Sequence, residues 1–227
     1  MTSIFKRIPV VKERSLYFRV AIIILSLISG AFMISPTIVY FIKKSSPLTE
    51  MPTNSFFYIL KALFAISIII ASVIFAVYKN TKVIAIPSFI GLLTTIYPFV
   101  YKINVYKEYK SFIEQFSMTA DYTSYLVNIG IYALFMLLCL LTLLYSLGLL
   151  PNNLIVLVFS ALTITAVIFV TVDRAKIIEY DIYNIYDILS FTYASVTALL
   201  PAVFTLSTKI VKSNKKTSRY KPKRMRS

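Results

Sequence analysis

One ionisable side chain, Lys61, lies inside a long apolar stretch of this sequence. A cation within a membrane is a candidate for an ion path or for binding a substrate carboxylate, because an ionised group is costly in hydrocarbon. The alternative is that the four-carbon stem of Lys61 snorkels to the nearer membrane surface. No acid lies in any apolar stretch to pair with Lys61, and this favours snorkelling.

Uncharged polar side chains lie in the later apolar stretches. Asn128 could contact a ligand, but a hydrogen bond to a neighbouring helix is the favoured interpretation. A series of hydroxyls could line a polar path, although Ser and Thr also bond to helix carbonyls, which favours a packing role. The hydroxyl residues singled out for either role are Thr192, Ser195, Thr197 and Thr205, with Thr163 and Thr165 beside them in the sequence pattern.

The sequence offers few groups for catalysis. Histidine is absent and the single cysteine is Cys139, so the commonest metal ligand and the commonest general base are missing. Motifs such as HExxH and GxSxG do not occur. The acids Glu179, Asp181 and Asp187 are interpreted as part of a solvated face. We therefore expect a protein that is not an enzyme and that uses no cofactor and no metal.

Long apolar segments must position these side chains. The chain is 58% hydrophobic and 15% charged, with a mean hydropathy of +0.78, whereas a soluble domain is about one quarter charged. A helix of ~20 apolar residues crosses a bilayer core of ~30 Å. We therefore predict an all-α, polytopic helical bundle between a basic leader, 1–19, and a basic tail, 209–227. Its six spans are expected at 20–42, 56–78, 83–101, 125–150, 154–172 and 189–208.

The distribution of Lys and Arg predicts the orientation of this bundle. If the N-terminus is inside, sixteen basic residues lie inside and seven lie outside, while eight of the nine acids lie outside. Basic residues are enriched on the cytoplasmic side of membrane proteins. We therefore expect both termini to be cytoplasmic.

Two polar connectors are expected to form short amphipathic helices on the outer face. In 102–121, the residues Val105, Tyr109, Phe112 and Phe116 recur at helical spacing. The segment 174–187 has a similar apolar stripe with tyrosines nearby, and tyrosine favours the headgroup region of a bilayer.

Small residues predict where the spans touch one another, because they let helix backbones approach closely. Ser26 and Gly30 are four residues apart on the first span. Ala194, Ala198 and Ala202 repeat that spacing on the last span. We expect both sets to lie at helix–helix contacts.

The C-terminal tail contains nine basic residues and no acid. Each basic residue near an anionic bilayer contributes about 1 kcal/mol of attraction, so we expect contact with anionic headgroups at the inner face or with a partner protein. Nucleic acid is disfavoured because Tyr220 is the only aromatic residue available for stacking. The residues assigned to this contact are Lys212, Lys215, Lys216, Arg219, Lys221, Lys223, Arg224 and Arg226.

Two functions from different classes fit these features. The first is a non-catalytic structural or accessory subunit of a larger membrane complex, with other membrane subunits as partners. The alternative is the transmembrane component of a transporter, either a permease or a substrate-binding subunit. The layout of six spans with both ends inside resembles ABC permease subunits and the substrate-binding subunits of vitamin transporters, without a shared motif. A transporter is expected to have a water-reachable cavity near the membrane midplane between spans three and six. The expected location is a prokaryotic plasma membrane, with an organelle inner membrane as the alternative.

Overall fold

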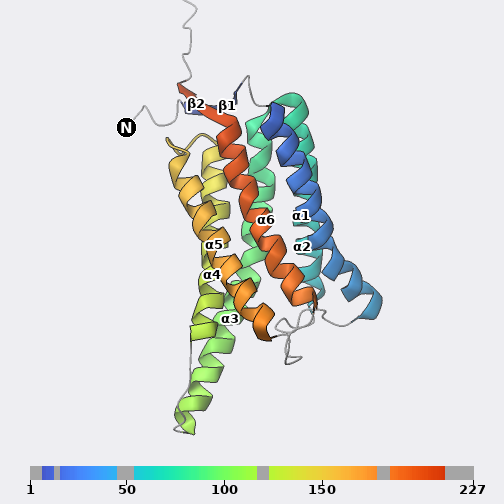
Figure 1. Ribbon diagram of the computed structural model, residues 1–227, viewed down its shortest axis with the longest axis vertical. Coiled ribbons are helices and arrows are strands. Elements are labelled where there is room, and N and C mark those ends of the chain that lie inside the picture. Colours follow the sequence, from blue (N-terminus) through green and yellow to red (C-terminus); the bar gives the residue numbers. More distant parts are fainter. Residues whose placement is uncertain (1–6, 13–15, 45–53, 117–122, 178–184, 213–227) are drawn as a thin grey trace, which may run out of the picture.

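The computed structural model describes residues 7–12, 16–44, 54–116, 123–177 and 185–212. In these ranges the chain forms a bundle of long α-helices with a short β-ribbon at one end (Figure 1). The α-helices are α1 (Leu16–Lys43), α2 (Ser55–Tyr78), α3 (Ala85–Gln115), α4 (Thr123–Ser146), α5 (Leu154–Ile177) and α6 (Ile185–Ser207). A 3-10 helix, η2 (Thr81–Ile84), precedes α3, and the strands are β1 (Arg7–Val11) and β2 (Thr208–Lys212).

The helices form a closed ring. Each helix packs against its neighbours in the sequence, and α6 returns to pack against α1. The contact between α1 and α6 includes the hydroxyls of Ser29 and Thr197, which are hydrogen-bonded to each other and buried. On the other side of α6, the Ser160 hydroxyl of α5 donates to the carbonyl of Ala198. This closure gives the bundle a central axis around which side chains from most of the helices meet.

Five helices are long and apolar enough to cross a membrane. They are α1, α2, α4, α5 and a continuous segment from Thr81 to Gln115, whereas the described apolar part of α6, Ala194–Ser207, is shorter. Large aliphatic side chains such as Ile70 and Leu162 are about half exposed on the outside of the bundle, as expected for a surface in lipid. The protein is therefore a helical, membrane-embedded protein with several spanning helices.

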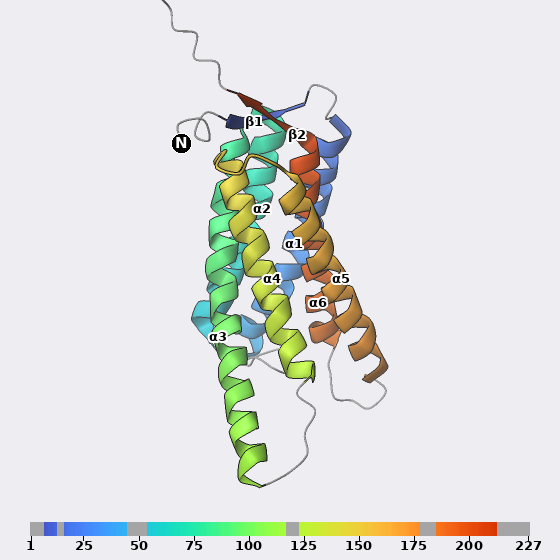
Figure 2. The same ribbon diagram turned by 90° about the vertical axis from the view of Figure 1, so that its left-hand side faces the viewer.

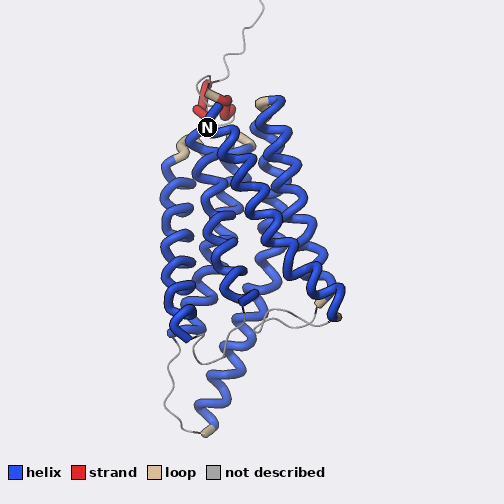
Figure 3. Tube along the Cα trace, turned by 45° about the vertical axis from the view of Figure 1, so that its right-hand side comes forward, coloured by secondary structure: helices blue, strands red, loops and turns tan. Residues whose placement is uncertain are grey.

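The β-ribbon was not expected from the sequence. β1 and β2 pair antiparallel, with Ile8 opposite Val211 and Val10 opposite Lys209. The ribbon joins the two ends of the chain at one end of the bundle (Figure 3), which we call the ribbon end. The short strands lie in segments whose sequence was interpreted as a basic leader and tail, because a strand of five residues carries little periodic signal by itself.

Side chains of the bundle hold the ribbon in place. The Thr81 hydroxyl donates to the Pro9 carbonyl at 3.0 Å. On the other strand, the Thr208 and Tyr145 hydroxyls are 2.7 Å apart, and both residues are buried. The ribbon therefore closes one end of the ring rather than lying apart from it.

The prediction of a separate surface helix at 102–121 is wrong. The segment continues α3 without a break as far as Gln115, and its C-terminal part projects beyond the ends of the other helices (Figures 1 and 2). The physical reason is that no glycine or proline occurs between Pro98 and the end of α3 at Gln115 to stop the helix. Pro98 itself lies inside α3.

The second expected surface helix, 174–187, falls mostly outside the described residues. Its first part belongs to α5, which extends to Ile177, and its last part belongs to α6, which begins at Ile185. The residues between them are not described.

Candidate functional site: a central chamber and a lysine–tyrosine cluster

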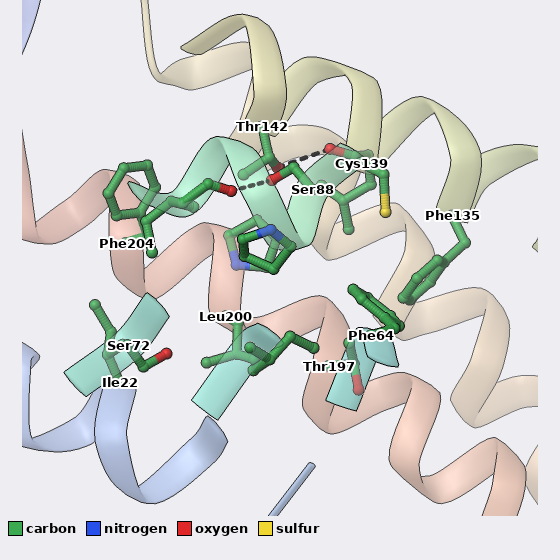
Figure 4. A pocket seen from close by; sticks show the side chains of 15 residues that line it. Ile22, Phe64, Ser72, Ser88, Phe135, Cys139, Thr142, Thr197, Leu200 and Phe204 are labelled. Carbon is green, nitrogen blue, oxygen red and sulfur yellow. Dashed lines mark hydrogen bonds between the residues drawn. The ribbon is translucent and has the colours of Figure 1, made fainter. Parts of the chain in front are cut away.

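A chamber of about 60 Å³ lies on the axis of the bundle. It is lined by side chains of α1, α2, α3, α4 and α6, together with Ile84 of η2, and most of the lining is apolar (Figure 4). One buried water needs roughly 10–15 Å³ of such space, so the chamber is large enough for a small molecule or for part of a larger one. Pro87 of α3 and Pro201 of α6 both line it.

Three of the four hydroxyls in the lining are bonded to the protein. Ser88 donates to the carbonyl of Ile84 at 2.8 Å, and Thr142 donates to the carbonyl of Leu138 at 2.7 Å. Thr197 is bonded to Ser29 across the junction of α6 and α1. A hydroxyl that is bonded to a helix carbonyl presents little polarity to the space beside it. The chamber therefore suits an apolar group better than an ion.

Aromatic rings bound the chamber at its two ends (Figure 4). At the end nearer the start of α2, Phe64 and Phe135 face one another. At the other end, Phe204 packs edge-on against Phe75 and Tyr145, with ring centroids 5.3 and 5.8 Å away. Rings of this kind can separate a cavity from the space beyond it by a change of rotamer.

Gly91 allows Phe64 to take its position. A Cβ atom at Gly91 would lie 2.7 Å from two ring carbons of Phe64 and 3.0 Å from the sulfur of Cys139. These distances are closer than a methyl group tolerates. Gly91 therefore lets α2, α3 and α4 approach closely at this end of the chamber.

A second group of side chains gathers at the end of the bundle opposite the ribbon, which we call the tyrosine end. Tyr40 of α1 stacks on Tyr58 of α2 with ring centroids 4.3 Å apart, and its hydroxyl is 2.7 Å from that of Ser55. The ring of Phe57 contacts that of Tyr97 of α3, with ring centroids 5.6 Å apart. Tyr101 and Tyr132, which are partly buried, complete this aromatic group.

Three polar side chains with nitrogen donors are buried in the same half of the bundle. Lys61, Lys102 and Asn128 are each only 7% exposed, and each has interaction partners. Lys61 was expected to snorkel to the membrane surface. In the structure it lies on the face of α2 that is buried in the bundle. We call the tyrosines Tyr40, Tyr58, Tyr97, Tyr101 and Tyr132, together with Lys61, Lys102 and Asn128, the lysine–tyrosine cluster.

Comparison of the chain with protein-family models, with curated proteins and with solved structures finds no significant match. Its function must therefore be inferred from the geometry of the chamber and the cluster.

The structure separates the residues that the sequence grouped as a polar path. Thr197 lines the chamber, whereas Lys61 and Asn128 lie toward the tyrosine end. Thr205 is fully buried and donates to the carbonyl of Ala202 at 2.9 Å. Ser195 is half-buried, and the side chain of Thr192 is outside the described part of α6.

Lys102 was missed because it was assigned to a polar connector. The signal that could have found it is a stripe along α3 with a spacing of three or four residues. Pro87, Gly91, Thr94, Pro98 and Lys102 are all buried. A helix that keeps this face buried up to Lys102 has not ended there.

The residues assigned to helix packing lie in the bundle as follows. Ser26 and Ala198 are fully buried. Gly30 is buried where α1 meets α2, because a Cβ there would lie 2.6 Å from the Ile69 side chain. Ala194 and Ala202 are half-buried.

The tail residues assigned to lipid contact are described only at their start. Lys212 ends β2, where it is paired with Arg7, and the remaining basic residues, 215–226, lie outside the described residues. Among the residues that are described, no group of three His, Cys, Asp or Glu is arranged to hold a metal.

Proposed function

We propose that this protein is the non-catalytic transmembrane component of a transport system, and that the central chamber takes up the apolar part of its substrate. The observation that supports this proposal is a chamber lined by both α3 and α6, the pair of helices between which a transport cavity is expected. Pro201, which lies inside α6, lines the chamber, and a proline inside a helix interrupts its hydrogen-bond ladder, as in the broken helices that form binding sites in transporters.

In this proposal the chain crosses the membrane six times, with both termini in the cytoplasm. The pairing of β1 with β2 supports an even number of spans, because it joins the two flanks of the bundle at one end. Arg7, Lys12, Lys209 and Lys212 lie in or beside the ribbon, and the positive-inside rule makes this end cytoplasmic. A prokaryotic plasma membrane is the proposed location.

Cys139 allows a direct test, because it lines the chamber and is the only cysteine in the chain. A chamber that opens to water during transport should expose Cys139 to a membrane-impermeant, cationic methanethiosulfonate. The protein is reconstituted in vesicles with one orientation, and the reagent is added to each side in turn. We expect modification from at least one side, measured as the mass shift of the intact protein.

The matched control is Leu137→Cys in a Cys139→Ser background. Leu137 lies two residues away at a similar depth, but it is 43% exposed on the outside of the bundle, where lipid excludes the reagent. Because methanethiosulfonates react with the hydrated thiolate, Cys139 should react roughly tenfold faster than this control. Equal rates for the two positions would overturn the transport proposal.

The second candidate function is an accessory subunit of a larger membrane complex, and the exposed face of the ribbon favours it. Ile8, Val10 and Val211 are each more than 40% exposed on this face. Among the described residues the sheet consists of these two strands, and an outer edge of such a ribbon is a site to which a partner strand can bind. This function predicts a stoichiometric complex in mild detergent that Ile8→Glu with Val211→Glu disperses, whereas Lys44→Glu at the tyrosine end leaves it intact. Wild-type protein that is monomeric by native mass spectrometry would contradict it.

A further inference from the structure

We propose that the central chamber binds a small, uncharged aromatic molecule with one hydroxyl or carbonyl group, and that the Ser72 hydroxyl bonds to that group. Because this names the substrate class of the chamber, it rests on the transport function proposed above. Three features support it: the size of the chamber, the aromatic rings at its ends, and a buried hydroxyl in its lining that has no partner among the described residues.

The first feature is the size of the chamber. Its volume of about 60 Å³ gives the room that roughly four to six buried waters need. On α2 the lining runs from Phe64 to Ser72, which is a rise of about 12 Å along the helix axis. Apolar cavities of roughly this capacity bind molecules of the size of benzene. The space therefore suits one six-membered ring with a small polar substituent.

The second feature is the apolar and aromatic lining. Phe64 and Phe135 bound one end of the chamber, and Phe204 bounds the end at which Ser72 lies (Figure 4). Aromatic rings attract one another in offset-stacked and edge-on arrangements, which favours an aromatic ligand over an aliphatic one of the same size. Among the described residues that line the chamber, none carries a charge. Because an ionised group without a partner is costly in such a space, the ligand is uncharged.

The third feature is the hydroxyl of Ser72. This residue lines the chamber, is only 3% exposed, and has no hydrogen-bond partner among the described residues. By contrast, Ser67 of the same helix donates to the carbonyl of Phe64 at 2.7 Å, and the other three hydroxyls of the lining are bonded as described above. A serine hydroxyl both donates and accepts, so that of Ser72 can bond to either a hydroxyl or a carbonyl of a ligand.

The position of Ser72 sets the orientation of the ligand. Phe75 follows Ser72 by one helical turn toward the ribbon end, and its ring packs against that of Phe204. A polar group that bonds to Ser72 therefore lies at the Phe204 end, and the ring of the ligand extends toward Phe64 and Phe135. A buried hydroxyl without a partner is costly, and a ligand bound in this way removes that cost.

The test is the binding of phenol and of toluene to the full chain in a neutral detergent, measured from the rise of Tm with ligand concentration. The two molecules share one ring and have nearly the same shape, but only phenol has a hydroxyl. Each should raise Tm by about 3–6 °C at ten times its dissociation constant. Benzoate, which is ionised at neutral pH, should leave Tm unchanged.

The variant Ser72→Ala decides whether the serine bonds to the ligand. It should weaken the binding of phenol about two- to tenfold, which corresponds to one lost hydrogen bond, and leave the binding of toluene unchanged. Partition of a ligand into the detergent is the same for every variant, so it cancels in this ratio. The matched control is Ser67→Ala, which removes a hydroxyl of the same helix outside the chamber lining. It should bind both molecules as the wild type does.

Three results would overturn the proposal. They are wild-type protein whose Tm rises with neither phenol nor toluene, a rise with benzoate equal to that with phenol, and an equal loss of both ligands in Ser72→Ala. Binding at equilibrium does not require the chamber to open to either side of a membrane. Binding of phenol through Ser72, together with equal reaction rates for Cys139 and its lipid-facing control, would therefore overturn the transport function alone.

Discussion

The two halves of the bundle bury polar groups in different ways. Toward the ribbon end, hydroxyls such as Ser88 and Thr142 bond to backbone carbonyls one turn earlier in the chain, and a largely apolar chamber remains between them. Toward the tyrosine end, the interior contains the cations of Lys61 and Lys102. The difference shows that one ring of helices can leave an apolar chamber in one half and bury two lysine side chains with their interaction partners in the other.

The largest expected change in stability comes from a substitution at the boundary between the two halves. Gly91→Ala should destabilise the protein by about 1–3 kcal/mol, because the new methyl meets the Phe64 ring and the Cys139 sulfur. Gly130→Ala on α4 should be neutral or stabilising by about 0.5–1 kcal/mol, since nothing lies within 4 Å of its Cβ position. Unfolding in dodecyl sulfate measures both changes.

A double variant tests the cause of that loss. Phe64→Leu removes the ring atoms that the new Cβ would meet, so the combination with Gly91→Ala should lose less stability than the sum of the two single changes. If the stability losses of the two single variants simply add in the double variant, the close contact with Phe64 is not the cause of the loss in Gly91→Ala.

A smaller effect compares tyrosine hydroxyls at the two ends. Tyr145→Phe should cost about 1 kcal/mol, because it removes the buried hydrogen bond between Tyr145 and the Thr208 hydroxyl at the ribbon end, although that hydroxyl still donates to the carbonyls of Phe204 and Thr205. Tyr40→Phe at the tyrosine end should cost less, since its bond to Ser55 is only partly buried. The two variants are compared in the same unfolding assay. An equal or larger loss for Tyr40→Phe would contradict this difference between the two ends.

The smallest expected change in stability comes from the contact between α1 and α6 that closes the ring of helices. Thr197→Val keeps the shape of the side chain but removes its bond to Ser29 between α1 and α6. Interhelical hydrogen bonds in membranes contribute ~0.6 kcal/mol on average, and we expect a loss of that size. Thr165→Val, at an exposed position of α5, is the control and should change stability by much less. If the two threonines give the same result, the bond does not stabilise the closure.

The sequence predicted the helices better than the site. The bounds expected for the second span, 56–78, nearly match those of α2, because a long apolar run between Asn54 and Lys79 has clear ends. Asn54 caps the first turn and Lys79 ends the helix in the left-handed conformation. Lys102 was missed for the opposite reason, since a lysine at the end of an apolar run looks the same whether its helix stops or continues.

By itself, the sequence determined that this is a helical membrane protein, because only long apolar helices satisfy their backbone hydrogen bonds in hydrocarbon. It also selected Lys61, Asn128 and Thr197 as the polar groups to follow. The tertiary structure decided which of these lie together. The chamber is lined by residues of five helices, α1, α2, α3, α4 and α6, and the continuation of α3 past Tyr101 buries Lys102 within the bundle. Such contacts join residues far apart in the chain, and the periodicity of one helix carries no information about the rotation and depth of its neighbour.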